Sequence, residues 1–484
     1  MTTQSMPSNS RRQVRNFVII WVVVTLIMGA CTFIAIYTAY GALNDRAQQV
    51  NVLPPTVTDS QAAVVNATPI PTRQIVNPPT NTPPPTPAAV AQAATAVDAA
   101  TATDAPPPTP APTLLPVNDK LYQVGIQVQV SPDFNPDNQD LWMGAVADQL
   151  HMKWIKQQVR WEDIERERGN YDWGQLDFAL PIAAERGIHV MLSIVTAPQW
   201  AREPGVDTSK HGPPANPQDY ATFVSEILKR YPGMVHAVEV WNEMNLDREW
   251  TSVNGLNAND YVTLLRTTYQ AVKAVDPGVI VISGALSPTG GWTEPDGRVS
   301  AIDDFSYLDG LIAGGMLNYA DCVGAHHNGI NMNPNETWDA VTNDPTASFR
   351  GPFDNKHHSW SFRSTLQTYA NKIQVAGSDL RLCVTEFGWA STEDLDGTPP
   401  GFEFANDNTL EEQKQWTIDA VNNMEQWGIV WLAFLWNLNY GPQAGWDPNN
   451  DNVPYSIIGK DWQFRPVYDA IGQWQLDYQA RTGQ

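Results

Sequence analysis

Cysteine is scarce in this chain of 484 residues, which contains only three. No two of them have CxxC spacing and none lies at a zinc-site spacing from a histidine, so the sequence disfavours a disulfide scaffold and a zinc site. Cys322 and Cys383 lie in apolar segments that are typical of buried strands, and Cys31 lies in a longer apolar run. We therefore interpret Cys322 and Cys383 as buried free thiols, with a bridge between them as the less favoured alternative.

Positive charge is also in short supply. Residues 119–484 contain 24 Lys and Arg against 48 Asp and Glu. Nucleic-acid binding depends on neutralising phosphates, so this balance argues against a nucleic-acid partner, and it disfavours an anionic substrate. The glycine-rich signatures GxGxxG and GxxxxGK(S/T) follow none of the expected strands, which leaves nucleotide binding without support. We predict no cofactor.

The N-terminal part has one long run without charge, at residues 17–40, and about 20 such residues span a bilayer. Arg11, Arg12 and Arg15 precede the run. The positive-inside rule then predicts a cytoplasmic N-terminus at 1–16, a transmembrane signal anchor at 17–40 and an extracytoplasmic remainder, which locates the protein at the cell membrane. A cleaved signal peptide is the alternative, although its apolar region is typically only about 7 to 15 residues long.

Residues 41–118 have few large apolar side chains and are dominated by Pro, Thr and Ala. Residues 51–118 alone hold 16 of the 38 prolines. Such a composition cannot bury enough apolar surface to fold, so we predict a disordered linker that acts as a semi-rigid spacer.

Residues 119–484 alternate between short apolar runs and amphipathic stretches. Eight candidate strands occur, at 121–130, 154–160, 188–195, 235–241, 279–284, 321–326, 380–386 and 429–436. Candidate helices include 219–231, 259–275, 409–427 and a last one at 464–478. Nearly continuous apolar strands that alternate with helices indicate a parallel sheet covered on both faces. We predict an α/β fold, a (β/α)8 TIM barrel, with a doubly wound open sheet as the alternative.

Two glutamates stand at the ends of predicted strands, Glu243 after the fourth and Glu386 after the seventh. Either one alone is compatible with a helix cap or an ion pair. In a barrel, however, the carboxyl ends of the strands carry the active site, and the fourth and seventh strands face each other across its mouth. Hydrolysis of glycosidic bonds requires such a pair of carboxyl groups.

The segments around these glutamates resemble clan A of the glycoside hydrolases. The shared features are Asn-Glu at 242–243, Thr-Glu-Phe-Gly-Trp at 385–389 and the eight strand–helix units. The segments 161–177, 197–200 and 323–326 are most similar to family 39, with family 5 as the neighbouring relative. The resemblance implies a retaining glycosidase in which Glu386 is the nucleophile and Glu243 is the general acid and base, with a raised pKa.

The resemblance also implies substrate-binding roles for residues at other strand ends. Asn242 would bind the 2-hydroxyl of the sugar, and Arg160 would lie near Glu386 and keep it ionised. Many clan members have a tyrosine two residues after the histidine of the sixth strand, whereas this chain reads His326, His327, Asn328. Either His326 or Asn328 would replace that contact with the nucleophile, or the position is empty.

Tryptophan is abundant, with 19 residues, and flat aromatic faces stack against the apolar faces of sugar rings. Trp200, Trp389 and Trp436 follow the third, seventh and eighth predicted strands, so we predict that they line a sugar cleft. His357 and His358 form a pair, but the sequence offers no evident third ligand, so we predict no metal site.

We expect a retaining hydrolase that acts on a neutral oligo- or polysaccharide at the cell surface. Two alternatives stay open, a non-catalytic carbohydrate-binding barrel and a transglycosylase with the same residues. Neither the identity of the sugar nor the oligomeric state follows from the sequence.

Overall fold

A computed structural model describes residues 121–131, 134–340 and 357–483 of the chain. The predicted cytoplasmic segment, transmembrane anchor and linker at 1–118 lie outside these residues. Among the helices of the described part, none has both the length and the apolar character needed to cross a membrane.

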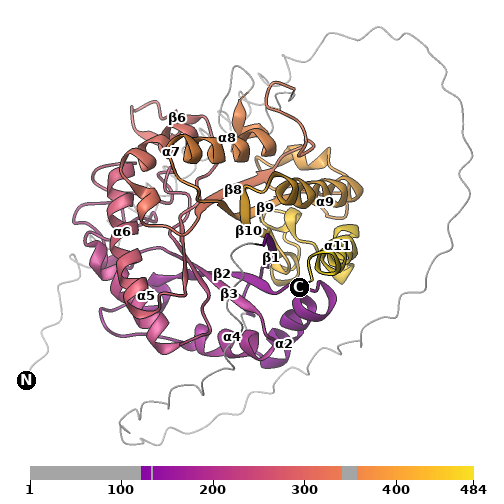
Figure 1. Cartoon of the computed structure of the whole chain (residues 1–484), viewed down its shortest axis with the longest axis horizontal. Helices are drawn as coiled ribbons and strands as arrows, with labels where there is room; N and C mark the ends of the chain where they lie inside the picture. Colours follow the sequence, from indigo (N-terminus) through magenta and orange to yellow (C-terminus); the bar gives the residue numbers. More distant parts are fainter. Residues whose placement is uncertain (1–120, 132–133, 341–356, 484) are drawn as a thin grey trace, which may run out of the picture. The chain divides into compact units, whose positions relative to one another are not determined.

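The described residues form a ring of helices around a central barrel of parallel strands (Figure 1). The barrel strands are β1 (Gln123–Gln127), β2 (Trp154–Arg160), β3 (His189–Val195), β4 (Ala237–Val240), β5 (Ile280–Ser283), β8 (Val323–Gly329), β9 (Leu382–Trp389) and β10 (Val430–Leu435). Their order is β5-β4-β3-β2-β1-β10-β9-β8. Parallel bridges from Ile282 to Cys322 and from Leu286 to Ala325 join β5 to β8, so the sheet closes and the predicted (β/α)8 fold is confirmed.

The helices begin where the sequence provides caps. Asn216, Asn257 and Thr409 each accept a backbone N–H at the start of α5 (Pro217–Arg230), α6 (Ala258–Val275) and α9 (Leu410–Trp427), three of the predicted helices. The other helices are α2 (Pro136–Gly144), α3 (Trp161–Ile164), α4 (Gly174–Glu185), α7 (Asp304–Ala313), α8 (Phe362–Val375), α10 (Tyr440–Gln443) and α11 (Pro466–Thr482).

Side chains alternate along each strand between the barrel interior and the helix layer. The lower interior is a small apolar cluster that includes Trp154, Ala237, Ile282 and Cys383. Residues of opposite parity, such as Val238 and Val384, join the larger core under the helices. This alternation sends polar side chains of β2, β4, β8 and β9 into the upper barrel, where the site lies.

A disulfide joins Cys322 and Cys383, whose Cα atoms are 5.8 Å apart. The interpretation of these cysteines as free thiols is therefore wrong. Cys322 directly precedes β8 and Cys383 lies in the adjacent β9, and both side chains belong to the barrel interior. Two residues on neighbouring strands of one face have the separation that a disulfide requires.

An antiparallel hairpin of β6 (Gly291–Thr293) and β7 (Val299–Ile302) interrupts the connection after β5, and the sequence did not predict it. The hairpin packs on the loop that follows β4. The Ile302 N–H donates to the Asn245 carbonyl at 2.9 Å, and the Asn245 amide donates to the carbonyls of Ile302 and Ser287. The loop that carries Glu243 is thereby held by backbone contacts from the next connection.

Candidate active site

Glu243 lies in an irregular turn after β4, not at the start of a helix. Trp241 and Glu243 both have positive φ, at 74° and 43°. This conformation costs side-chain-bearing residues about 1–3 kcal/mol and persists only where the surroundings impose it. Here the Trp241 indole donates to the Glu249 carbonyl, and the Glu243 N–H donates to the Ala285 carbonyl. The helix-cap interpretation of Glu243 is therefore excluded.

Glu386 reaches the barrel interior because β9 contains a bulge. Ala325 pairs with Val384, but the next residue of β8, His326, pairs with Glu386, so Thr385 is the extra residue. Without the bulge, strict alternation would send Thr385 inward and Glu386 into the helix layer. With it, both face inward, and Thr385 donates a hydrogen bond to the buried Glu239.

His326 bridges the two glutamates. Its Nδ1 lies 3.2 Å from Glu243 Oε1, and its Nε2 lies 3.7 Å from Glu386 Oε1. The imidazole is 1% exposed and the two carboxyl-bearing side chains are 12–13% exposed. The two predicted catalytic glutamates therefore face one cavity of the barrel, separated by the width of one imidazole ring.

Lys156 is the cation that pairs with Glu386, with Nζ 2.8 Å from Oε1. The same Nζ lies 3.5 Å from Glu239 Oε2. Burial acts to lower the pKa of Lys156, but the charges of Glu386 and Glu239 raise it above its ordinary value, so Lys156 stays charged. The sequence did not predict Lys156 or Glu239 as site residues, because a charged side chain inside a strand is normally assigned to a solvent-exposed face.

Arg160 does not pair with Glu386, so the prediction that it keeps Glu386 ionised is wrong. Arg160 forms an ion pair with Glu162 and contacts His211 Nε2 at 2.8 Å. The other nitrogen of His211 lies 3.7 Å from Glu249, which in turn contacts Arg248. Arg160 thus belongs to a polar network on the Glu243 side, because Lys156, four residues earlier in the same strand, already occupies the position beside the nucleophile.

Glu243 is held in its ionised form. Burial acts to raise its pKa, but the hydrogen bond with His326 and the charge of Arg248, 3.2 Å away, outweigh burial and lower the pKa of Glu243 to about 2. This is opposite to the raised pKa that the sequence predicts for a general acid. The negative charge of Glu386 and the hydrogen bond with Glu243 raise the pKa of His326 against the lowering effect of its burial. The lowered pKa of Glu243 and the raised pKa of His326 both favour the proton of this pair on His326.

Asn328 donates to Glu386 Oε2 at 3.2 Å, so it makes the contact for which clan members use a tyrosine. Asn242, beside Glu243, is 9% exposed. Tyr440 follows β10 and accepts from the Gln127 amide, and its pKa is raised to about 12 by burial and the charge of Glu386. Tyr440 lies at the site without having been predicted from the sequence.

The three tryptophans that were predicted to line a sugar cleft lie in different surroundings. Trp436 packs on Tyr440, and Lys156 Nζ lies 5.8 Å from the centre of its ring, so it belongs to the site. Trp389 is only 1% exposed and its indole donates to the Met332 carbonyl, so the prediction that it stacks on sugar is wrong. The bulge explains this, since it turns Glu386 inward and Trp389, three residues later, into the helix layer.

Trp200 is not brought to the two glutamates. Its indole N–H donates to the Glu165 carbonyl, its ring packs edge-on against Trp161, and the Arg168 guanidinium lies 4.5 Å from its centre.

Solved structures share this architecture. A GH39 enzyme from Xanthomonas axonopodis pv. citri superposes with a TM-score of 0.50 at 16% identity, over 75% of this chain and 68% of that one. A monomeric beta-xylosidase from Caulobacter crescentus CB15 gives 0.50 at 16% identity, over 75% and 69%. The fold is one that family 39 glycoside hydrolases also have. The resemblance seen in the sequence is thus confirmed at the level of the fold.

A family 39 glycoside hydrolase from Bacteroides cellulosilyticus WH2 is 18% identical, with a TM-score of 0.49 over 72% of this chain and 62% of that one. The chain therefore spans less than two thirds of that protein's length. No protein-family model matches the sequence, and neither does any curated protein sequence.

Proposed function

We propose that this protein is a retaining glycoside hydrolase in which Glu386 is the nucleophile and Glu243 is the general acid and base. The observation that carries the proposal is the pair itself: two glutamates from β9 and the loop after β4 face one cavity, and Lys156 and Asn328 both contact the first. A binding protein needs no such pair. The shared fold with glycoside hydrolases is consistent with this assignment.

The contacts suggest a two-step reaction. Glu386 attacks the anomeric carbon while Glu243 protonates the departing oxygen, which leaves a glycosyl ester on Glu386. Glu243 then removes a proton from water as the water attacks the same carbon, and the sugar leaves with its configuration retained. Asn242, adjacent to the acid, is placed to bind the 2-hydroxyl.

Charge balance gives Glu239 a part in this sequence. Before reaction the Lys156 ammonium lies between two carboxylates, Glu239 and Glu386. Esterification removes the charge of Glu386, and a buried ammonium without a partner would be strongly unfavourable. Glu239 is 0% exposed and remains as that partner, so we assign it the role of holding Lys156 charged in the covalent intermediate.

The proton that Glu243 needs is already in the site. His326 holds it 3.2 Å from Glu243 Oε1, and Arg248, which favours the ionised glutamate, is 69% exposed at its side chain. Because the arginine end of this ion pair is exposed to solvent, binding of a sugar can displace Arg248. Its departure would raise the pKa of Glu243 and draw the proton from His326 to the carboxylate.

The location of the enzyme is part of the same proposal. The uncharged run at 17–40 would anchor the chain, and the linker at 41–118 would extend the barrel into the extracytoplasmic space. The Cys322–Cys383 disulfide supports this, because disulfides persist mainly in oxidising compartments. The excess of acidic residues supports a neutral substrate.

The test is the stereochemistry of hydrolysis. The full-length chain, purified in detergent, is screened on a panel of neutral aryl glycosides, and the first product is followed by proton NMR. Retention of the anomeric configuration is expected, and inversion would overturn the assignment of Glu386 as nucleophile. Transfer of the sugar to an added alcohol in preference to water would favour the transglycosylase, and binding without turnover on every glycoside would favour the carbohydrate-binding barrel.

A further inference from the structure

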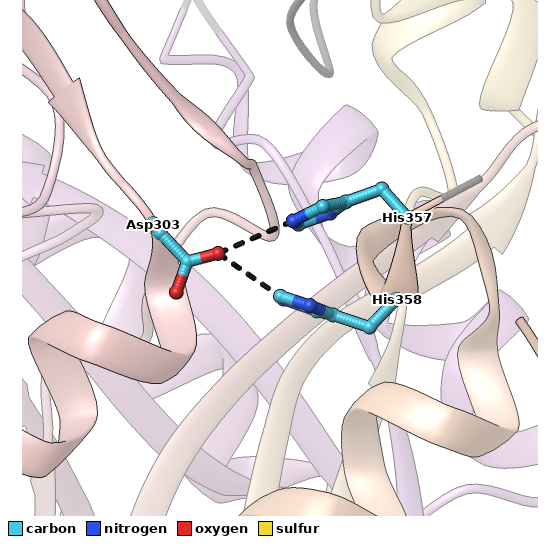
Figure 2. A group of neighbouring side chains, drawn as sticks. All are labelled: Asp303, His357 and His358. Atoms are coloured by element: carbon cyan, nitrogen blue, oxygen red, sulfur yellow. Dashed lines mark ion pairs between the residues drawn. The ribbon is translucent and has the colours of Figure 1, made fainter. Parts of the chain in front are cut away.

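A second group of convergent polar side chains lies apart from the two glutamates. Asp303 follows β7 and caps α7, whereas His357 and His358 lie at the start of the short 3₁₀ helix η5 (His358–Trp360). The three side chains point toward one another (Figure 2), with His357 Nε2 3.3 Å and His358 Nε2 3.8 Å from Asp303 Oδ2. All three ligand-type atoms lie within 4.8 Å of one another.

These distances also fit a metal ion bound between the three side chains. Zinc binds histidine nitrogen and carboxylate oxygen at about 2.0–2.2 Å, and in tetrahedral geometry the ligand atoms are then about 3.3–3.6 Å apart. The two nitrogen–oxygen distances fall at or just above this range. Small side-chain rotations would therefore place an ion at bonding distance from both histidines and Asp303.

The surroundings orient these ligands. The Ser359 backbone N–H donates to His357 Nδ1 at 3.2 Å and the Ser359 hydroxyl lies 3.0 Å from the same nitrogen, so this side of the ring is held while Nε2 faces Asp303. Asp304 is fully buried and its Oδ1 lies 2.9 Å from His358 Nε2. The Tyr369 hydroxyl and the Thr289 N–H both donate to Asp304, which fixes this second carboxylate beside the three ligands.

We propose that Asp303, His357 and His358 bind one divalent transition-metal ion, for which their mixed nitrogen and oxygen donors favour Zn²⁺. Calcium and magnesium prefer oxygen ligands alone, so this set selects against them. The ion joins the connection after β5 to the connection after β8, two loops that no strand pairing holds together at this point among the described residues. The sequence did not reveal this site, because Asp303 lies more than fifty positions before the histidine pair.

The ion also bears on the loop of Glu243. Ile302, the last residue of β7, exchanges two hydrogen bonds with Asn245, and Asp303 is the next residue. Fixing Asp303 therefore restricts the end of β7 and, through Asn245, the segment two residues after Glu243. The metal would act as a structural clamp on the acid's loop, without contacting the reacting atoms.

The binding test uses the full-length chain stripped with a chelator and titrated with ZnCl₂ by calorimetry, with CaCl₂ and MgCl₂ as comparison ions. One Zn²⁺ per chain is expected for the wild type, with no measurable binding for Asp303→Asn or His357→Ala. The matched control is His151→Ala, which removes a histidine that precedes β2, at the opposite end of the barrel. Absence of Zn²⁺ binding in the wild type, its survival in both ligand variants, or a preference for Ca²⁺ would each overturn the proposal.

A second measurement guards against variants that misfold and tests the clamp. Circular dichroism of the metal-free Asp303→Asn protein should match that of the metal-free wild type. Hydrogen exchange at the Ile302 amide should slow when Zn²⁺ is added to the wild type and stay unchanged in Asp303→Asn. Equal slowing in both proteins would contradict the clamp, and neither readout depends on glycosidase activity.

Discussion

Glu386 is surrounded by groups that favour its charge, with Lys156, Asn328 and His326 all within 3.7 Å of its carboxylate oxygens. These contacts fix the direction in which the carboxylate points. Replacing Glu386 with Gly should reduce turnover of an activated aryl glycoside to background, and added azide should restore part of it by occupying the vacated space and attacking in its stead.

The measurement is the initial rate with and without azide, together with the configuration of the glycosyl azide formed. Glu386→Gln is the matched control, because its amide fills the cavity and should block the rescue. A Gly variant that azide fails to rescue would remove Glu386 from the role of nucleophile.

In the proposed mechanism, Glu243 donates a proton to the leaving group. Glu243→Ala should slow release of poor leaving groups by about 10²–10⁴-fold and affect activated ones far less, because general acid catalysis contributes on that order. The measurement is kcat/KM across aryl glycosides of graded leaving-group pKa. An equal loss on all of them would contradict the assignment.

After the hydrogen bond with His326, the charge of Arg248 is the next cause that lowers the pKa of Glu243, and it can be tested through pH. Its positive charge lowers that pKa, so Arg248→Ala should raise it and keep Glu243 protonated to higher pH. The alkaline limb of the kcat/KM profile should then move upward by up to about one pH unit, since the Arg248 side chain is largely exposed to solvent. Arg266→Ala, an exposed substitution on α6, is the control. An unchanged or downward-shifted limb would show that Glu243 is not coupled to Arg248.

At the level of elements, the Cys322–Cys383 disulfide ties β8 to β9, the two strands that carry His326 and Glu386. The bond closes a loop across 61 residues, and such cross-links typically stabilise by about 2–4 kcal/mol. The double substitution of both cysteines by Ala should lower the free energy of unfolding by about this amount, measured by urea denaturation. Cys31→Ala is the control, and a double variant as stable as that control would contradict the expectation.

The elements also show which features sequence patterns can reveal. All eight barrel strands were predictable, since each is a short apolar run between amphipathic helices. The hairpin of β6 and β7 was not, because its residues Gly291–Thr293 and Val299–Ile302 are partly exposed and lack an apolar period. The bulge at Thr385 was hidden for a related reason, since register depends on the neighbouring strand.

The residues of the candidate site likewise fall into those that the sequence could predict and those that it could not. Glu243 and Glu386 could be identified because strand ends of a barrel converge, whatever the details of packing. Lys156 and Glu239 could not, because they lie inside strands and only the closed barrel brings them together. The predicted contact of Arg160 was wrong because a position at a strand end shows which face of the barrel a residue occupies, but not which neighbour it contacts.

At the level of the whole molecule, net charge distinguishes between substrates. The chain carries a formal charge of −23, which repels anionic sugars at long range and leaves neutral ones unaffected. The KM for a neutral aryl glycoside should stay constant as NaCl is raised, whereas the KM for the matching aryl uronide should fall as salt screens the repulsion. Tighter binding of the uronide at low salt would contradict a preference for neutral substrates.

The single extra residue in β9 reverses the alternation of side chains between the two halves of this strand. Before Thr385, odd-numbered residues face the cavity and even-numbered ones face the helices; from Glu386 onward the assignment is reversed, so that Phe387 and Trp389 join the outer core. Pairing this strand with β8 without the bulge would leave the sequence unchanged, yet it would send Glu386 into the helix layer and bring Phe387 into the cavity in its place. Activity in this barrel therefore depends on how β9 pairs with β8 as much as on which residues β9 contains.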